Sequence, residues 1–250
     1  MTQVYRVRTV ESPFGPWRSL YVPDTTQPVP GIVILHGSEG CFAGWSDCLA
    51  IQLAQFGFAC APFGYSKDST AWTSGKIVDV DLDETVEALT RLRAAPAVRG
   101  RKVALLGISR GAEHALLLTS LMVRDEVPGL PDAVVALAAS DTIVGGFQGP
   151  DDDRDGDDPS IKAWRWLGSS EALVPGMPIA IERYSGPVLL SHGRQDDLWG
   201  VDRTERLAAR LRAAGRTPEI NYYDGGHTPS PQQQDAWNAR VVDFLRRTIG

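Results

Sequence analysis

Short apolar runs alternate along this chain with longer stretches whose apolar positions recur every three or four residues. Residues 31–35 are apolar throughout, which is typical of a strand buried on both faces of a sheet. Residues 79–95 begin with acidic side chains and end before a proline, the pattern of an amphipathic helix. The predicted strands cover residues 4–10, 17–22, 31–35, 58–62, 102–106, 133–139, 187–191 and 219–223; the predicted helices cover residues 46–56, 79–95, 112–122, 203–214 and 232–249. Strands that alternate with helices in this way predict an α/β fold with a mostly parallel sheet flanked by helices.

Residues 141–180 interrupt the alternation, and we expect them to form a cap-like insertion over the carboxyl edge of the sheet. Open α/β sheets bind their ligands at that edge. Trp164 and Trp166 then cover a bound substrate, or they bury the insertion against the sheet; the pattern leaves both interpretations open.

An acidic run, residues 151–158, lies within the insertion. Its first six residues match the D-x-D-x-D-G start of a calcium loop, but Lys162 stands where such a loop has its bidentate glutamate. We therefore expect a solvated acidic loop and no metal ligands.

Composition narrows the class of protein. The 250 residues suit a single domain, 43% of them are hydrophobic, and the net charge is −6. Such a charge favours neither nucleic acid nor an anionic membrane surface as a partner. The three cysteines, Cys41, Cys48 and Cys60, are too few and too unevenly spaced for a disulfide framework, and we expect them to be buried. With no leader peptide or membrane span in the sequence, we expect a cytoplasmic protein.

One G-x-S-x-G motif, centred on Ser109, has a context that gives it meaning. An apolar strand runs into Gly107, and a helix follows directly after Ser109. This is the strand–turn–helix of a nucleophile elbow, in which glycines leave room for a tight turn that exposes the hydroxyl. We therefore predict that Ser109 is a nucleophile.

A serine nucleophile needs a base, and in this kind of site the chain order is serine, acid, histidine. His227 follows the last predicted strand and is the expected base; His192, at the end of another strand, is the alternative. Asp196 stands three residues beyond Gly193, which ends that strand, and is the expected acid, with its neighbour Asp197 as the alternative. The acid would hold the imidazole in the tautomer that can accept a proton.

An oxyanion requires two N–H donors. We expect one from Arg110, directly after the nucleophile, and one from Ser38, with Gly37 as the alternative, in the loop after strand 31–35. His36 would brace that loop. The predicted substrate-contacting residues are Gly37, Trp164, Trp166 and Trp199.

These residues resemble the catalytic domain of the family that contains acyl-CoA thioester hydrolases and bile-acid-CoA:amino-acid acyltransferases, and more distantly dienelactone hydrolases. The stretches that carry the resemblance are residues 105–113, 186–190, 193–199 and 225–227. The resemblance implies the α/β-hydrolase fold and an acyl-enzyme formed from a thioester or ester, without a cofactor. Amino-acid-conjugating members of the family use cysteine, so Ser109 favours transfer to water.

The sequence thus predicts a serine hydrolase acting on a small-molecule acyl ester or thioester. An acyltransferase that delivers the acyl group to an amine or alcohol is the first alternative. A non-catalytic binding protein on a hydrolase scaffold is the second, although the predicted triad is complete.

Overall fold

The computed structural model describes residues 3–15, 18–66, 75–149 and 158–250. Within these ranges, eight strands form one sheet in the order β1-β2-β4-β3-β6-β7-β11-β12. The antiparallel pairs β1–β2 and β2–β4 lie at one end, and the strands from β4 to β12 run parallel. The sheet strands are β1 (Val7–Glu11), β2 (Ser19–Pro23), β3 (Gly31–Leu35), β4 (Ala59–Phe63), β6 (Val103–Ile108), β7 (Ala133–Leu137), β11 (Val188–Gly193) and β12 (Glu219–Tyr223).

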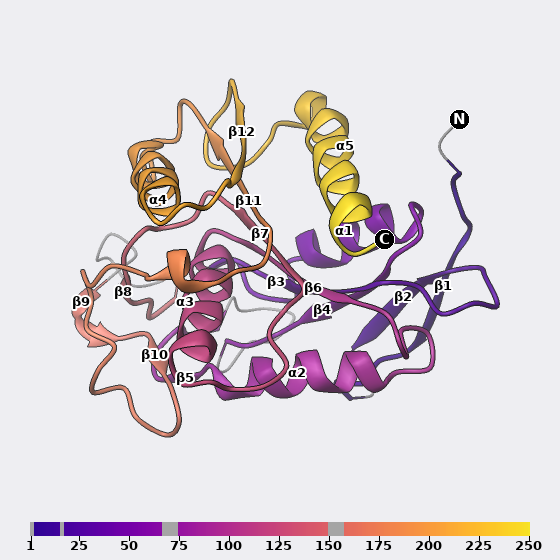
Figure 1. The fold of residues 1–250 in the computed structure, drawn as a ribbon, viewed down its shortest axis with the longest axis horizontal. Coiled ribbons are helices and arrows are strands. Elements are labelled where there is room, and N and C mark those ends of the chain that lie inside the picture. Colours follow the sequence, from indigo (N-terminus) through magenta and orange to yellow (C-terminus); the bar gives the residue numbers. More distant parts are fainter. Residues whose placement is uncertain (1–2, 16–17, 67–74, 150–157) are drawn as a thin grey trace.

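Helices cover both faces of the sheet (Figure 1). One face packs on α1 (Trp45–Ala54) and α5 (Pro231–Thr248), whose apolar side chains share a buried cluster with the sheet. The other face packs on α2 (Asp83–Ala94), α3 (Arg110–Arg124) and α4 (Asp202–Ala213). The central strands β3, β6 and β7 are buried along their whole length, as their uninterrupted apolar sequences predict.

The segment between β7 and β11 packs along α3. It contains β8 (Gly145–Gly146), β9 (Asp158–Lys162), β10 (Trp164–Arg165) and the short 3-10 helix η1 (Ile181–Arg183). β8 pairs with β9, and β10 pairs with β5 (Val80–Asp81), just ahead of α2. The expected cap-like insertion therefore lies mainly beside α2 and α3 (Figure 1).

Several expectations change in detail. α2 begins at Asp83 and not at residue 79, because β5 pairs with the insertion immediately before it. Cys48 is exposed on α1, whereas Cys41 and Cys60 are buried as expected. Residues 151–157 of the acidic run lie outside the described residues, and within the described ranges no group of three acidic, histidine or cysteine side chains is arranged to hold a metal ion. None of the described helices is long and apolar enough to cross a bilayer.

Candidate active site

Ser109 occupies a strained turn between β6 and α3. Its backbone has φ 52° and ψ −121°, in the half of conformational space that side chains other than glycine rarely enter. The turn is held by a hydrogen bond from Ser109 N–H to the carbonyl of Leu137 on β7, 2.8 Å long. Strain of this kind persists only where the surrounding structure imposes it, and it is common at active sites.

Gly107 and Gly111 allow the turn to pack tightly. A Cβ on Gly107 would collide with the carbonyl of Gly111, and a Cβ on Gly111 would collide with the backbone carbonyls of Leu35 and His36. The start of α3 therefore touches both β6 and the loop that follows β3. A side chain at either glycine would separate the nucleophile from that loop.

Asp196 and His227 meet across two neighbouring loops. Nδ1 of His227 donates to Oδ2 of Asp196 at 2.8 Å. The loops after β11 and β12 are joined by backbone hydrogen bonds from Arg194 to Tyr223 and from Gln195 to Gly225, which fix the approach. Nε2 of His227 has no hydrogen-bond partner among the described residues, so it is available to accept a proton.

Asp196 is held as a carboxylate. Its Oδ1 accepts the N–H groups of Leu198 and Trp199 at 3.0 and 2.9 Å. Burial would raise the pKa of Asp196, but hydrogen bonds from His192, His227 and the Trp199 N–H outweigh burial and hold the pKa well below its usual range. Asp197, the alternative acid, is exposed, and the structure brings Asp196 to His227 instead.

His192, the alternative base, is fully buried with both ring nitrogens engaged. Its Nε2 lies 2.7 Å from the carbonyl of Trp199 and 3.0 Å from Oδ2 of Asp196, and its Nδ1 lies 2.8 Å from the hydroxyl of Thr204. Because a carbonyl can only accept, Nε2 carries the hydrogen. His192 therefore donates a second hydrogen bond to the acid that holds His227.

The loop after β3 lies beside the nucleophile. The N–H of Ser38 has no acceptor in the described part of the chain, whereas the N–H of Gly37 donates to the Glu39 carboxylate at 2.9 Å. Arg110 opens α3, and the first N–H groups that bond back to Ser109 O belong to Ala112 and Glu113. The N–H of Ser38, rather than that of Gly37, is thus the candidate second donor to the oxyanion, beside the N–H of Arg110.

His36 braces this loop. Its Nδ1 contacts the carbonyl of Gly37 at 2.6 Å, and its ring stacks on Tyr65 with centroids 4.1 Å apart. Burial lowers the pKa of His36 to about 4, so the ring is neutral near pH 7.

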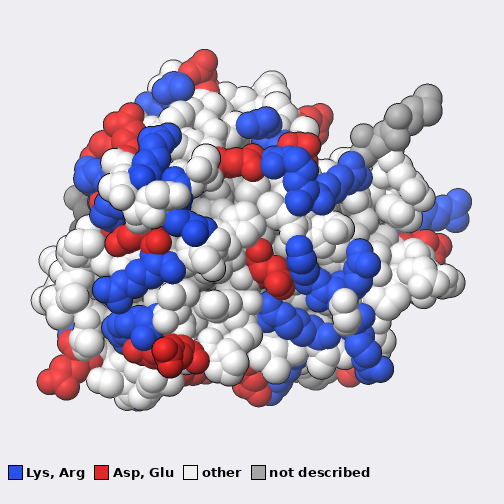
Figure 2. All heavy atoms as spheres, in the orientation of Figure 1, with Lys and Arg blue, Asp and Glu red and all other residues white. Residues whose placement is uncertain are grey.

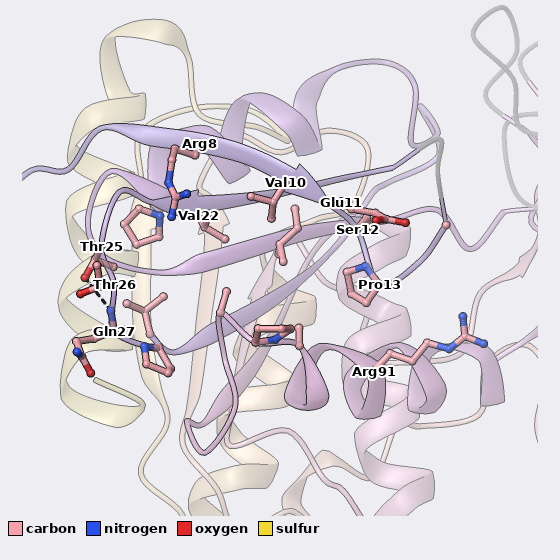
Figure 3. A pocket seen from close by; sticks show the side chains of 18 residues that line it. Arg8, Val10, Glu11, Ser12, Pro13, Val22, Thr25, Thr26, Gln27 and Arg91 are labelled. Atoms are coloured by element: carbon pink, nitrogen blue, oxygen red, sulfur yellow. Dashed lines mark hydrogen bonds between the residues drawn. The ribbon is translucent and has the colours of Figure 1, made fainter.

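A cavity of about 280 Å³ joins the groups expected to react. Its lining consists of Ser38, Glu39, Ile108, Ser109, Phe147, Leu198, His227 and Thr228. A larger cavity of about 1030 Å³ lies under the β1–β2 hairpin (Figure 3), at the end of the sheet remote from β6. None of the predicted catalytic residues lines the larger cavity, so the smaller one is the candidate active site.

Solved structures share this arrangement of strands and helices. A bacterial heroin esterase superposes with a TM-score of 0.66 at 21% identity, covering 100% of this chain and 86% of its own. A dienelactone hydrolase-like promiscuous phosphotriesterase from metagenomic libraries superposes with a TM-score of 0.65 at 15% identity, covering 99% of this chain and 100% of its own. This chain has the α/β-hydrolase fold. The predicted fold class is confirmed.

The chain is similar in sequence to proteins named acyl-CoA thioesterases. Acyl-coenzyme A thioesterase 6 of Mus musculus is 28% identical over 223 residues, which are 85% of this chain and 52% of the mouse protein. The Homo sapiens protein of the same name is 28% identical over 254 residues, 94% of this chain and 57% of the human protein. The chain thus spans about half the length of these relatives, and no family model matches it. The predicted resemblance to acyl-CoA thioester hydrolases is confirmed.

The tryptophans predicted to contact substrate lie elsewhere in this α/β-hydrolase fold. Trp164 is completely buried and donates its indole N–H to Glu113 at 2.8 Å, and Trp166 donates to Asp125 at 2.6 Å. Both anchor the insertion along α3 and neither lines the cavity at Ser109. Trp199 also does not line it; its ring stands edge-on to His227, with centroids 5.9 Å apart.

Sequence reasoning missed several residues that line the cavity. Phe147 comes from the insertion and Leu198, which is 65% exposed, comes from the loop after β11. A leucine in a polar loop, two residues after the predicted acid, is the sequence signal that could identify Leu198. Glu39 lies in the predicted oxyanion loop, but the sequence pattern alone predicts no role for its side chain.

Proposed function

We propose that this chain is a serine hydrolase that cleaves an acyl thioester or carboxylic ester through an acyl-enzyme on Ser109. The observation that carries the proposal is the shared cavity: Ser109 on its strained turn and His227, held by Asp196, line the same small space. A nucleophile, a base and an orienting acid in this relation are the parts that acyl transfer requires.

In the first half of the reaction, Ser109 Oγ attacks the acyl carbonyl carbon while Nε2 of His227 takes the hydroxyl proton. The N–H groups of Ser38 and Arg110 donate to the oxygen on which negative charge develops. The imidazolium then gives its proton to the leaving thiol or alcohol as the bond between acyl carbon and leaving group breaks. The acyl group remains on Ser109.

In the second half, water replaces the leaving group. His227 removes a proton from water as the oxygen attacks the acyl-enzyme, and then returns that proton to Ser109 Oγ as the ester bond breaks. Throughout, Asp196 remains ionised: it fixes the imidazole tautomer and stabilises the imidazolium. In both halves of the reaction, every proton moves between the protein, the substrate and water.

The lining of the cavity favours a small acyl group. Ile108, Phe147 and Leu198 give it apolar walls, and its volume of about 280 Å³ is at the lower end of ligand sites. The relatives named acyl-CoA thioesterases support a thioester as the substrate.

Arginines of α4 serve the structure near this site. Basic side chains over α4 interleave with acidic ones and do not form one basic field (Figure 2). Arg206 and Arg210 both bond to Asp141, which follows β7, at 2.8 and 3.5 Å. These contacts anchor the start of the insertion, so we do not assign these two arginines to substrate binding.

The test is a panel of p-nitrophenyl esters and acyl-CoA thioesters of increasing chain length, assayed with wild type, Ser109→Ala and Ser170→Ala. We expect turnover of short acyl groups, loss of that turnover by at least a thousandfold in Ser109→Ala, and wild-type rates in Ser170→Ala. A fluorophosphonate probe should label wild type and Ser170→Ala but not Ser109→Ala.

Two outcomes contradict the proposal. Absence of both turnover and labelling in folded wild type supports a binding protein on a hydrolase scaffold. Acyl transfer to an added amine in preference to water, measured by product analysis, supports an acyltransferase.

A further inference from the structure

A carboxyl group lies beside the nucleophile on the oxyanion loop. Glu39 lines the same cavity as Ser109 and His227. Its Oε1 accepts the N–H of Gly37 at 2.9 Å, which folds the side chain back over the loop. A Cβ built on Gly37 would collide with Oε2 of Glu39 and would also lie 3.2 Å from Cβ of Ser109. The carboxyl and the nucleophile therefore flank the same point of the loop.

The negative charge of Glu39 is not balanced by a lysine or arginine among the described residues. No lysine or arginine of the described residues forms an ion pair with it, and His227 is the nearby basic side chain that acts on its pKa. The crowded surroundings raise the pKa of Glu39 above its usual value, against the opposing effect of the Gly37 N–H, because burial penalises the charged form. Glu39 as a whole residue is nevertheless exposed, and it lines the cavity, where a substrate can reach it.

A carboxylate at this point acts on the reaction. It repels the negative charge that develops on the substrate oxygen, and it attracts a positive group placed near the reacting carbonyl. Such a positive group would neutralise Glu39 while the oxyanion forms, so its benefit is largest in the transition state.

We propose that Glu39 selects substrates that carry a positively charged group, such as a protonated amine or a quaternary ammonium, close to the scissile carbonyl. This inference rests on the proposed function of Ser109 and names a substrate class for the same site. Gln at position 39 retains an oxygen for the Gly37 N–H and removes only the charge, which makes Glu39→Gln the informative variant.

The experiment compares substrates that differ in charge but hardly in shape. Acetylthiocholine and 3,3-dimethylbutyl thioacetate place the difference in the leaving group; S-phenyl esters of 3-aminothiopropionic and thiobutyric acid place it in the acyl group. For each pair, kcat/KM of the charged substrate is divided by that of the neutral one. Dividing the wild-type ratio by that of Glu39→Gln cancels the intrinsic reactivity of the substrates.

We expect at least one pair to show a wild-type preference for the charged substrate of about tenfold or more, relative to the hydroxide-catalysed rates. Glu39→Gln should bring the ratio close to one. Glu171→Gln, which removes an exposed carboxylate of the insertion outside the cavity, should keep the wild-type ratio. The substrate pair whose ratio changes in Glu39→Gln shows whether Glu39 acts on a charge in the leaving group or in the acyl group.

A wild-type ratio near one in both pairs overturns the inference, as does a ratio that Glu39→Gln leaves unchanged. A salt series on wild type needs no variant: because Glu39 is exposed, the preference should decrease between about 0.02 and 0.5 M salt, and a preference independent of salt argues against charge selection.

Two further comparisons separate Glu39 from the rest of the site. If Glu39 acted only by stabilising protonated His227, both members of a pair would change equally and their ratio would not. If Ser109→Ala retained turnover of the neutral substrates, the proposed function would fail; if Ser109→Ala abolishes it and the ratios stay flat, only the role of Glu39 fails.

Discussion

Replacing Asp196 with asparagine tests the orientation of the base by a change of one atom. Oδ1 of Asp196 accepts two backbone N–H groups, from Leu198 and Trp199, so the amide oxygen of asparagine should stay at that position. Its NH2 group must then take the place of Oδ2, which faces Nδ1 of His227 and Nε2 of His192. His192 cannot turn its donor away, because Trp199 O also requires it.

The magnitude follows from the tautomer. Facing an NH2 group, His227 accepts at Nδ1 and carries its hydrogen on Nε2, so it cannot take the Ser109 proton. The imidazolium also loses a carboxylate at 2.8 Å. We expect kcat/KM to fall by about three to four orders of magnitude, which corresponds to about 4 to 5.5 kcal/mol of transition-state stabilisation.

The assay is kcat/KM for a short p-nitrophenyl ester, with Asp197→Asn as the matched control because Asp197 is its exposed neighbour. Urea denaturation should show that both variants fold, and a fluorophosphonate probe should label Asp196→Asn far more slowly than Asp197→Asn. A folded Asp196→Asn enzyme within tenfold of wild type, or a larger loss in Asp197→Asn, refutes the reasoning.

Three further predictions concern stability. Gly111→Ala should abolish folding or cost several kcal/mol, measured by urea denaturation, because its Cβ meets backbone and not a side chain that can move. Glu113→Gln should lower the free energy of unfolding by about 3 kcal/mol, because it removes one charge from an ion pair with Arg110 that is 2.9 Å long and almost completely buried; a cost below about 1 kcal/mol contradicts this. Burial lowers the pKa of His36 to about 4 and of His114 to about 3. Below pH 6.5 the unfolded chain therefore binds more protons than the folded chain. As the pH falls from 6.5 to 4, each histidine should remove up to about 1.4 kcal/mol of stability per pH unit. Denaturation at pH 7 and pH 5 should show this loss, and His114→Gln should reduce it.

The parts of the site that sequence could predict are those with local causes. The turn at Ser109 requires residues without a side chain at positions 107 and 111. The two glycines therefore predict the turn from the sequence alone. The reach from Gly193 favours Asp196 over Asp197, and the structure brings Asp196 to His227. The alternation of buried strands and amphipathic helices likewise predicted the sheet that delivers these loops to one edge.

The tryptophans show what local reasoning could not decide. Trp164 and Trp166 are separated by one residue in a segment without a clear period, and an indole can equally cover a ligand or fill a core. Their positions are set by two acceptors, Glu113 on α3 and Asp125 directly after it, which lie 51 and 41 residues away in sequence. Only the folded chain shows that both indole N–H groups already have partners there, which leaves Phe147 as the described residue of the insertion that lines the cavity.

The same limit applies to charge, and there it changes the chemistry. Taken one loop at a time, Glu39 is an ordinary polar residue of a turn and Asp196 an ordinary acid. In the folded chain Glu39 lines the same cavity as His227, and Asp196 bonds to that imidazole from behind, with His192 as its second donor. In the proposed reaction, Asp196 mainly stabilises the positive charge that His227 gains, so Glu39 and the developing oxyanion remain as two negative groups close together. A substrate that supplies the missing positive charge lowers the barrier, and a substrate that adds a further negative charge raises it. Selectivity in this site should therefore depend on the charge of the acyl and leaving groups as well as on their size.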